Sequence, residues 1–172
     1  MEPILTVRNL TLQDIPLICD YWLNSSPEYL ESMGVDMQKL PGRKGWTDFL
    51  TEQVNLPNKQ KASFCLVWEA DGSPVGHSNI NNISPGEDAC MHLHIWNIED
   101  RKKGWGLEFI MLSLSIFCRE YNLKRILCEP YALNPAPNHL LKKAGFTFIE
   151  EVVKIPGSIN FEQPVKRWEI LC

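Results

Sequence analysis

The sequence predicts an α/β (α+β) domain built on a mixed central sheet of about six to seven strands with about four flanking helices. Three observations lead to this prediction. Segments with strand-like patterning alternate with amphipathic segments typical of helices. The segments follow one another without a repeat, low-complexity tract or linker, and 44% hydrophobic with 22% charged residues is ordinary globular composition. A chain of 172 residues can bury about 70% of its unfolded surface, so we expect one domain over residues 1–172.

The first half of the chain predicts two helices between strands. Residues 4–11 are patterned as a strand, and residues 12–24 as an amphipathic helix with Asp14 and Pro16 near its start. Turn residues dominate 25–46, which we expect to be a helical-loop excursion, and a second helix covers 47–55. Residues 63–80 give two strands around an Asp-Gly-Ser-Pro turn, a strong indication of a hairpin. A third strand follows at 89–96.

The second half predicts a buried helix, a strand, a short helix and a final strand pair. Residues 107–122 are apolar nearly all round, as in a helix packed deep against a sheet. A strand begins at Arg125 and ends at Pro130 or shortly after. Residues 137–146 form a short helix closed by Gly145 in the C′ position. The final pair covers 147–153 and 165–171.

Charge and cysteine usage exclude several classes of protein. A net charge of −4 argues against a broad nucleic-acid or anionic-membrane surface, because both need clustered excess cations. The N-terminal residues lack a cationic leader before an apolar run, and no stretch approaches the roughly 18 apolar residues of a membrane span. Six cysteines without a CxxC pair favour reduced, mostly buried thiols over a disulfide framework or a zinc ribbon. We therefore expect a cytoplasmic protein.

The stretch EDRKKGWGLEF, residues 99–109, is the first candidate binding site. Two closely spaced glycines before a helix let backbone N–H groups converge where the helix N-terminus carries about half a positive charge. We expect the ligand of this site to be a phosphate group. The string is neither a Walker loop nor the dinucleotide fingerprint, whose third glycine is replaced by Phe109. A solvated basic turn is the alternative.

The surrounding chain resembles the GNAT superfamily of acetyl-CoA-dependent N-acetyltransferases. The family's signature is Gln or Arg, two residues, Gly, one residue, then Gly or Ala, and Arg101, Gly104 and Gly106 match it. A second family segment, an Asn followed after about eleven residues by Gly-Phe, matches Asn134 and the pair at 145–146. The resemblance covers residues 6–169, is weakest over 25–60, and is nearest in style to the ribosomal-protein alanine acetyltransferases.

This resemblance implies a GNAT fold whose sheet splays apart between residues 90–96 and 125–130 to admit acetyl-CoA as cosubstrate. The backbone from Arg101 to Leu107 would hold the pyrophosphate, and Gly106→Glu would abolish coenzyme binding. No metal is expected. The implied coenzyme contacts are Ile95, Trp96, Arg101, Lys102, Lys103, Gly104, Trp105, Gly106, Leu107 and Asn134.

Two histidines are candidates for proton removal from the attacking amine. The strand CMHLHIW alternates, which places Cys90, His92, His94 and Trp96 on one face. Histidine titrates near pH 6.5, close to the working pH, and the pair resembles a His-Leu-His of arylalkylamine N-acetyltransferases, although only His92 falls on the family position. Hydrogen-bonded core histidines are the alternative, and a zinc site with Cys90 is a remote one, because no fourth ligand is evident.

Glu129 and Tyr131 are candidates on the other side of the expected gap. A carboxylate there could act as base through water and a phenol could protonate the thiolate, or both could simply hydrogen-bond at a strand end. Many family members carry a Tyr acid where this chain has Leu141, and the related branch favours Ser where it has Pro137. These departures keep open a second class of function, a non-catalytic acyl-CoA-binding or regulatory module.

The acceptor is only loosely determined by the sequence. The favoured function is acetyl transfer to a primary amine of a small molecule or peptide by direct attack in a ternary complex, with no nucleic-acid or membrane partner. An aromatic pocket and acidic side chains that attract an amine are candidates for acceptor binding, with solvated or core positions as the alternative. The oligomeric state is left open, with a homodimer as one option. The aromatic candidates are Trp22, Tyr29, Trp46 and Phe161, and the acidic ones Glu28, Glu31 and Glu162.

Overall fold

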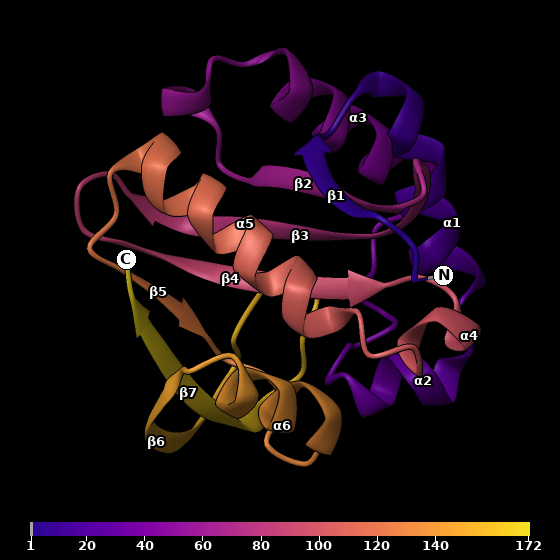
Figure 1. Cartoon of the computed structure of the whole chain (residues 1–172). Helices are drawn as coiled ribbons and strands as arrows, with labels where there is room; N and C mark the ends of the chain where they lie inside the picture. Colours follow the sequence, from indigo (N-terminus) through magenta and orange to yellow (C-terminus); the bar gives the residue numbers. More distant parts are fainter. Residues whose placement is uncertain (1) are drawn as a thin grey trace.

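The computed structural model describes residues 2–172, and all seven of its strands belong to one mixed sheet (Figure 1). Six α-helices and two short 3₁₀ turns accompany the sheet in these residues. None of these helices is long and apolar enough to span a membrane. The strands are β1 Leu5–Asn9, β2 Phe64–Ala70, β3 Ser73–Ser84, β4 Asp88–Ile95, β5 Arg125–Cys128, β6 Thr147–Lys154 and β7 Gln163–Leu171. The helices are α1 Ile15–Asn24, α2 Pro27–Ser32, α3 Arg43–Asn55, α4 Ile98–Arg101, α5 Gly106–Tyr121 and α6 Pro135–Lys143.

The strand order is β1-β2-β3-β4-β5-β7-β6. Neighbours are antiparallel except β4 and β5, which are parallel and are joined through α5. The predicted hairpin between β2 and β3 is confirmed, with Asp71 and Gly72 both at positive φ in the turn. The final strand β7 lies between β5 and β6, so the last two strands form a hairpin that extends the sheet beyond β5.

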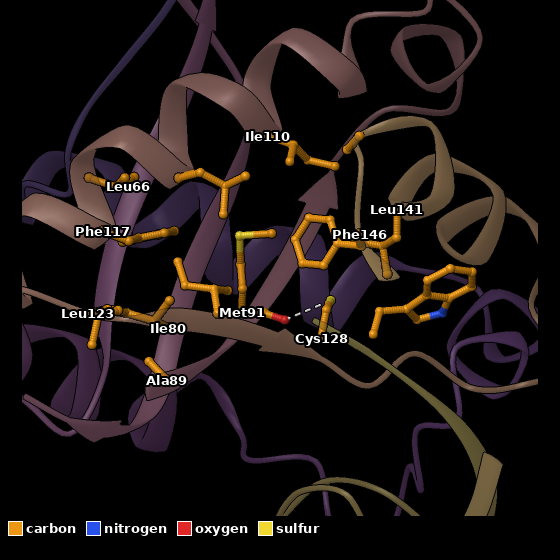
Figure 2. Close-up of a cluster of buried hydrophobic side chains, with 14 of the residues drawn as sticks. Leu66, Ile80, Ala89, Met91, Ile110, Phe117, Leu123, Cys128, Leu141 and Phe146 are labelled. Carbon is orange, nitrogen blue, oxygen red and sulfur yellow. Dashed lines mark hydrogen bonds between the residues drawn. The ribbon is translucent and has the colours of Figure 1, made fainter. Parts of the chain in front are cut away.

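Helices cover both faces of the sheet. The long helix α5 crosses one face in front of β3 and β4 (Figure 1), and a buried cluster joins it to α6 and the central strands. Figure 2 shows this cluster, in which Met91 of β4, Ile110 of α5 and Leu141 of α6 meet. A second cluster, centred on Ile18 and Trp22 of α1 with Leu50 of α3, packs on the other side. The amphipathic segments therefore bury their apolar faces as the sequence predicts.

The predicted elements are confirmed in type, with differences at their edges. The sequence indicated about four helices. The structure adds α2 inside the expected excursion and the one-turn helix α4, and α3 begins at Arg43, four residues before the expected start. A single turn such as α4 is too short to show a hydrophobic period. The helix α6 closes as predicted, because Gly145 has a φ of +88° and Phe146 N–H donates to the carbonyl of Leu141 at 3.1 Å.

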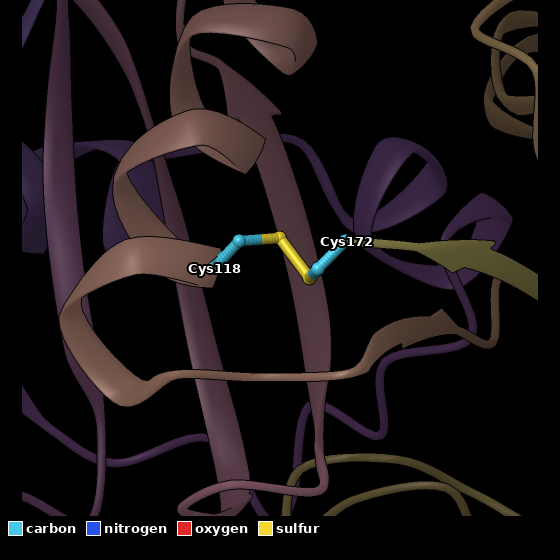
Figure 3. Close-up of a disulfide and its surroundings, with 2 residues drawn as sticks. All are labelled: Cys118 and Cys172. Atoms are coloured by element: carbon cyan, nitrogen blue, oxygen red, sulfur yellow. A yellow bond between two sulfur atoms is a disulfide. The ribbon is translucent and has the colours of Figure 1, made fainter.

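The expectation of reduced cysteines is wrong at one pair. Cys118, near the end of α5, is bonded to Cys172 across a Cα distance of 5.6 Å (Figure 3). The two residues are 54 positions apart, and only the return of β7 beside β5 brings the chain end to α5. The other four cysteines, Cys19, Cys65, Cys90 and Cys128, are free and buried, as expected.

Candidate functional site

The sheet opens between β4 and β5, as the GNAT resemblance implied. The two parallel strands pair only over residues 88–90 and 125–127. Beyond this contact β4 continues to Ile95, paired with β3 on one side alone. Figure 1 shows the two strands diverging. One long edge of β4 is therefore left for a ligand.

That edge presents backbone groups at alternate residues. Trp96 N–H donates to the carbonyl of Val75 at 2.9 Å, which identifies the β4 residues bonded to β3. Because bonding alternates along an antiparallel ladder, the N–H and C=O groups of Met91, Leu93 and Ile95 face the opening. The carbonyl of Met91 accepts from Cys128 Sγ at 3.0 Å and that of Ile95 from Arg101, so Leu93 keeps both of its groups for a ligand and Ile95 its N–H. An extended ligand that carries amide groups can hydrogen-bond to this edge.

The start of α5 beside the opening is suited to an anion. Gly104 has a φ of +80° in the turn before the helix, a conformation that strongly favours glycine. Trp105 is the N-cap and makes no side-chain cap bond, so the first N–H groups, at Gly106, Leu107 and Glu108, have no side-chain acceptor at the cap. These N–H donors and the positive end of the helix dipole both face the turn before α5, as in phosphate sites at helix N-termini.

The three cations of the motif have different surroundings. Arg101 donates to the carbonyls of Ile95 at 2.9 Å and Trp96 at 2.7 Å, and its guanidinium lies 3.8 Å from the ring centre of Tyr29. Arg101 thus ties the end of β4 to α2. Lys103 is held by Asp100 at 2.7 Å and lies over the Trp105 ring. Lys102 is exposed, which leaves its ammonium group accessible to a ligand phosphate.

Gly106 is buried against α6. A Cβ atom at this position would lie 2.8 Å from Cδ2 of Leu140. The structure therefore gives the glycine a packing role at the contact between α5 and α6. The sequence had suggested a different reason, close approach of a phosphate.

A cavity of about 420 Å³ lies on the other side of the opening. Its wall includes the five candidates His92, His94, Glu129, Tyr131 and Asn134. They come from β4, from the end of β5 and from the start of α6, and the chain brings them together as predicted. The motif residues 101–107 are not part of this wall.

His92 bonds across the strands to β3. Its Nε2 lies 3.1 Å from Oδ1 of Asn81, so the ring carries its proton on Nε2 and keeps a free lone pair on Nδ1. Burial lowers the pKa of His92 below its ordinary value, although the nearby Glu129 opposes the shift. His92 is a neutral imidazole at neutral pH.

His94 belongs to a buried aromatic and polar group. Its Nδ1 lies 3.0 Å from the hydroxyl of Tyr21, which lies 3.2 Å from the hydroxyl of Tyr29. The His94 ring stacks on His77 with centres 4.8 Å apart, and Trp96 Nε1 donates to His77 Nδ1 at 2.8 Å. Burial lowers the pKa of His77 to about 3. Burial, then the neighbouring His77, hold the pKa of His94 well below its ordinary value.

Glu129 is an ion-paired carboxylate. Lys154 of β6 donates to one of its oxygens at 2.8 Å, and Arg167 of β7 to the other at 2.7 Å. Burial opposes ionisation, but these two bonds outweigh it and keep the pKa of Glu129 below its ordinary value. A carboxylate bound in this way is a poor proton acceptor.

Tyr131 and Asn134 keep polar groups for a ligand. Among the described residues no hydrogen bond involves the Tyr131 hydroxyl, and the ring packs edge-on against Phe161. Asn134 is the N-cap of α6, yet its side chain makes no cap bond, so its amide remains available to a ligand. Leu141, where relatives carry a Tyr acid, is fully buried in the core.

Asn138, in the first turn of α6, is buried. It is 8% exposed, and its amide donates to the carbonyls of Tyr131 at 3.0 Å and Asn134 at 2.7 Å. Its Oδ1 accepts from Trp168 Nε1 at 2.9 Å. The residue holds the loop that carries Tyr131 and Asn134, whereas the neighbouring His139 is exposed.

Only some of the residues predicted to bind the acceptor lie at the cavity. Trp22 and Trp46 line the cavity, but the other two aromatic candidates, Tyr29 and Phe161, do not. The three acidic candidates are exposed and lie outside the wall. In residues 2–172 no group of three or more His, Cys, Asp or Glu could hold a metal ion.

The sequence reasoning missed Asn81, His77 and Tyr21. Asn81 and His77 lie opposite the predicted strand, with His77 paired to His94 and Asn81 to Cys90 in the β3 and β4 register. The predicted hairpin joins β2 to β3, whereas these contacts belong to the pairing of β3 with β4, whose register the sequence analysis did not predict. Tyr21 comes from α1, whose placement over the sheet no local pattern indicates.

Known proteins share this architecture. The spermidine N-acetyltransferase of Vibrio cholerae, in complex with CoA and spermine, aligns with a TM-score of 0.79 at 22% identity, covering 97% of this chain and 95% of that one. The ribosomal-protein-S5-alanine acetyltransferase of Vibrio fischeri aligns at 0.79 with 18% identity, covering 97% and 92%. A ribosomal L7/L12 alpha-N-protein acetyltransferase in complex with coenzyme A aligns at 0.75 with 14% identity, covering 97% and 93%. At these identities the likeness establishes the fold.

The sequence itself establishes the family. No curated protein sequence matches the chain. The family model described as the acetyltransferase (GNAT) domain, however, matches residues 5–147, which include β1 to β5, the opening between β4 and β5, and the glycine turn before α5. The chain therefore belongs to the GNAT family of acetyltransferases.

Proposed function

We propose that the chain transfers the acetyl group of acetyl-coenzyme A to a primary amine by direct attack within a ternary complex. The observation that carries the proposal is the opening between β4 and β5, with an anion-binding helix start at one end and a histidine-lined cavity at the other. The amine nitrogen bonds to the acetyl carbon, the carbon–sulfur bond breaks, and the thiolate takes up a proton. The amine, an ammonium in water, gives up two protons on the way to the amide, so the reaction releases one.

The coenzyme is held mainly by backbone in this proposal. The N–H groups of residues 104–107 receive the pyrophosphate, with Lys102 as the exposed cation beside it. Leu93 and the N–H of Ile95 bond the pantetheine arm along the β4 edge. Asn134 closes this arm from α6. Lys103, Trp105 and Arg101 shape the turn, and Trp96 shapes the end of β4, because its N–H and carbonyl already have partners.

His92 and His94 remove the protons. Both imidazoles are neutral at neutral pH and face the cavity, so each can accept a proton from the amine. We place the first transfer at Nδ1 of His92. His94 takes the second at Nε2 while it passes its Nδ1 proton to Tyr21; Tyr21 passes its own proton to Tyr29, and the half-buried Tyr29 releases its own to solvent water. A positioned base of this kind contributes about 10² to 10⁴ in rate.

Tyr131 is the proposed general acid, and Glu129 a positioning residue. Tyr131 lines the cavity and its hydroxyl has no protein partner among the described residues, so its proton is available to the thiolate. The Glu129 anion, fixed by Lys154 and Arg167, raises the basicity of His92. The family assignment favours this catalytic role over the non-catalytic module, although Leu141 and Pro137 depart from relatives.

We also propose that residues 1–172 form one domain and act in the cytoplasm as a monomer or homodimer. Membership of all seven strands in one sheet supports the first point. Four free buried thiols support the cytoplasmic location. The disulfide between Cys118 and Cys172 is the one feature that would be reduced in that compartment.

Thermal unfolding with saturating acetyl-CoA, dephospho-CoA, NAD, ATP and zinc tests the coenzyme. A ligand at 100 times its Kd adds about 2.7 kcal/mol, several degrees for a domain of this size. A rise with acetyl-CoA, and a smaller one with dephospho-CoA, is the expected result. A rise with NAD, ATP or zinc and none with acetyl-CoA would overturn the proposal.

Release of free thiol in the presence of a panel of amines tests catalysis. We expect His92→Ala to lower turnover by about 10² or more, and Tyr131→Phe to slow the step that protonates the thiolate. Binding of acetyl-CoA without thiol release for any amine would instead support the non-catalytic module. Equal turnover in wild type and both variants would remove these residues from the mechanism.

A further inference from the structure

Part of the cavity wall is a patch of the sheet in which polar side chains of β3 and β4 lie side by side. Asn79 of β3 is directly opposite His92 of β4, and His94 is its diagonal neighbour, because the residue opposite His94 is His77. Side chains opposite each other in an antiparallel pair have Cβ atoms about 4.5–5.5 Å apart, and diagonal neighbours are about 7–8 Å apart. Asn79, His92 and His94 are all half-buried and line the cavity. They therefore surround one point of its wall.

Each of these three side chains has a hydrogen-bond acceptor atom without a partner among the described residues. His92 uses Nε2 in its bond to β3, which leaves Nδ1 free. His94 uses Nδ1 in its contact with the Tyr21 hydroxyl, which leaves Nε2 free. The one side-chain bond of Asn79 within residues 2–172 runs from its amide nitrogen to Oγ of Ser63 at 3.2 Å, which leaves Oδ1 free. The wall thus presents three neutral acceptors beside one another.

Three acceptors around one point match the three N–H donors of a primary ammonium group. In water each donor has a water partner, and entry into the cavity costs free energy unless protein atoms replace these waters. Glu129, the one carboxylate in the described wall, cannot replace them, because Lys154 and Arg167 occupy both of its oxygens. The two imidazoles replace two of the waters. Asn79 is placed to replace the third.

We propose that Asn79 is an amine-binding residue, which accepts the third N–H of a primary ammonium group whose other two N–H groups are held by His92 and His94. The two histidines take their protons as the nitrogen attacks the acetyl carbon. The N–H held by Asn79 is then the one that remains in the amide product. This inference rests on the proposed function, which assigns proton removal to the two histidines.

The proposed contact makes the site selective for primary amines. A secondary ammonium group has only two N–H donors, and both must leave before its amide forms. The Oδ1 atom of Asn79 then has no donor, and an unpaired polar atom in a covered site costs free energy. A site built to hydrogen-bond a substrate N–H rejects the analogue that lacks it for this reason.

Matched pairs of amines test the proposal in the thiol-release assay. Each primary amine of the panel is paired with its N-methyl derivative. In the wild type we expect kcat/KM to be about tenfold higher for the primary amine, which corresponds to about 1.4 kcal/mol. Asn79→Leu, which removes the acceptor atom and keeps a side chain of similar size, should lower kcat/KM for the primary amine about tenfold and bring the ratio close to one. An unchanged ratio in the folded variant would overturn the proposal.

Asn160→Leu is the matched control. Asn160 lies in the segment between β6 and β7, lines the same cavity, and donates from its amide to the carbonyl of Gly34 at 2.8 Å. This variant should change kcat/KM for both amines alike and leave their ratio as in the wild type. A ratio close to one here as well would contradict the assignment to Asn79. Thermal unfolding checks that both variants fold, and Asn79→Ala carries the same prediction if leucine prevents folding.

Calorimetric titration of the primary amine into the protein saturated with CoA tests the charge of the bound group. Repeating the titration in buffers of different ionisation enthalpy counts the protons released. We expect none to be released at neutral pH, because the ammonium group keeps its three N–H donors or passes a proton only to a histidine. Release of one proton per amine would show that the neutral amine binds with two donors, which overturns the proposal.

The two levels of inference fail in different ways. Absence of CoA binding, or CoA binding without acetylation of any amine, contradicts the proposed function itself. Acetylation of amines with the same preference for primary amines in wild type and Asn79→Leu contradicts only the role of Asn79.

Discussion

Gly106 at the start of α5 lies against Leu140 of α6 so closely that a Cβ atom would come within 2.8 Å of the leucine Cδ2. The start of α5 is thus packed against the second half of α6 at a residue without a side chain. The family motif has a packing reason here as well as an electrostatic one.

Gly106→Ala tests this packing. The near atom is the end of a flexible side chain, so we expect the variant to fold with a loss of about 1–3 kcal/mol for overpacking. Affinity for acetyl-CoA should fall about tenfold, because Leu140 must move and displace α6, the helix whose N-cap is Asn134. Isothermal titration measures the affinity and thermal unfolding the stability.

The double variant Gly106→Ala with Leu140→Ala is the control. It makes room for the new methyl group and should restore most of the affinity. Affinity that stays low in the double variant would show that the phosphate itself requires the glycine. The larger Gly106→Glu should abolish binding in either background, because its side chain cannot fit between the helices.

Glu129→Gln should act on stability more than on turnover. Removal of the charge leaves Lys154 and Arg167 without their shared partner, which costs roughly 1–3 kcal/mol for hydrogen bonds to a charged group. We expect kcat to fall less than tenfold, because the carboxylate only tunes His92. Glu150→Gln, which removes a more exposed partner of the same Arg167, should change both quantities little. A loss of turnover as large as that of His92→Ala would show that Glu129 is the base.

The type and order of the elements could be predicted from the sequence, because they depend on local periodicity and turn chemistry. The hairpin at Asp71 and Gly72 and the C-terminal glycine of α6 are such cases. The position of β7 between β5 and β6 could not, because it depends on contacts between distant segments. The bond from Cys118 to Cys172 follows from that topology and was missed with it.

In the candidate site, too, local features were predictable from the sequence and contacts between distant segments were not. Alternation along β4 correctly placed His92 and His94 on one face, since a side-chain period of two is local. Their partners Asn81 and Tyr21, and the two cations on Glu129, come from other elements. Whether Glu129 is a base or an ion-paired anchor was therefore undecidable from spacing, although its place at the end of β5 was predictable.

Stability should decline as the pH falls from 7 to 5. The pKa of His77 is about 3 in the folded protein and near 6.5 when unfolded, so below pH 6.5 the unfolded chain binds more protons and folding weakens. At about 1.4 kcal/mol per pH unit, His77 alone accounts for roughly 2 kcal/mol between pH 6.5 and 5. His92 and His94 shift in the same direction.

Denaturant unfolding at several pH values measures this decline. His77→Asn keeps an acceptor for the indole of Trp96 and removes the titration, so its stability should depend less steeply on pH. A slope equal to that of wild type would contradict the assignment. His139→Asn, an exposed histidine, is the matched control and should leave the slope unchanged.

Reduction of the bond between Cys118 and Cys172 should lower the melting temperature. The bond closes a loop of 54 positions, for which the chain-entropy relation gives about 4 kcal/mol as an upper value. Since the cross-link lies at the end of α5 remote from its start, acetyl-CoA affinity should be unaffected. Thermal unfolding of wild type with and without dithiothreitol, beside Cys118→Ser with Cys172→Ser, measures the effect. An unchanged melting temperature in the double variant would mean that the cross-link contributes nothing.

Tyr21→Phe should interrupt the proton path from His94 while the fold is kept, because only the hydroxyl that joins His94 and Tyr29 is removed. Burial holds the pKa of Tyr21 well above its ordinary value, so it passes a proton only by accepting one at the same time. We expect kcat to fall by about 10 to 10² with KM nearly unchanged, and the solvent deuterium isotope effect on kcat to increase. Tyr29→Phe, which leaves the His94 contact intact, should give a smaller loss. If Tyr21→Phe instead raises KM and leaves kcat and the isotope effect unchanged, Tyr21 supports the pocket and His94 does not pass its proton through it.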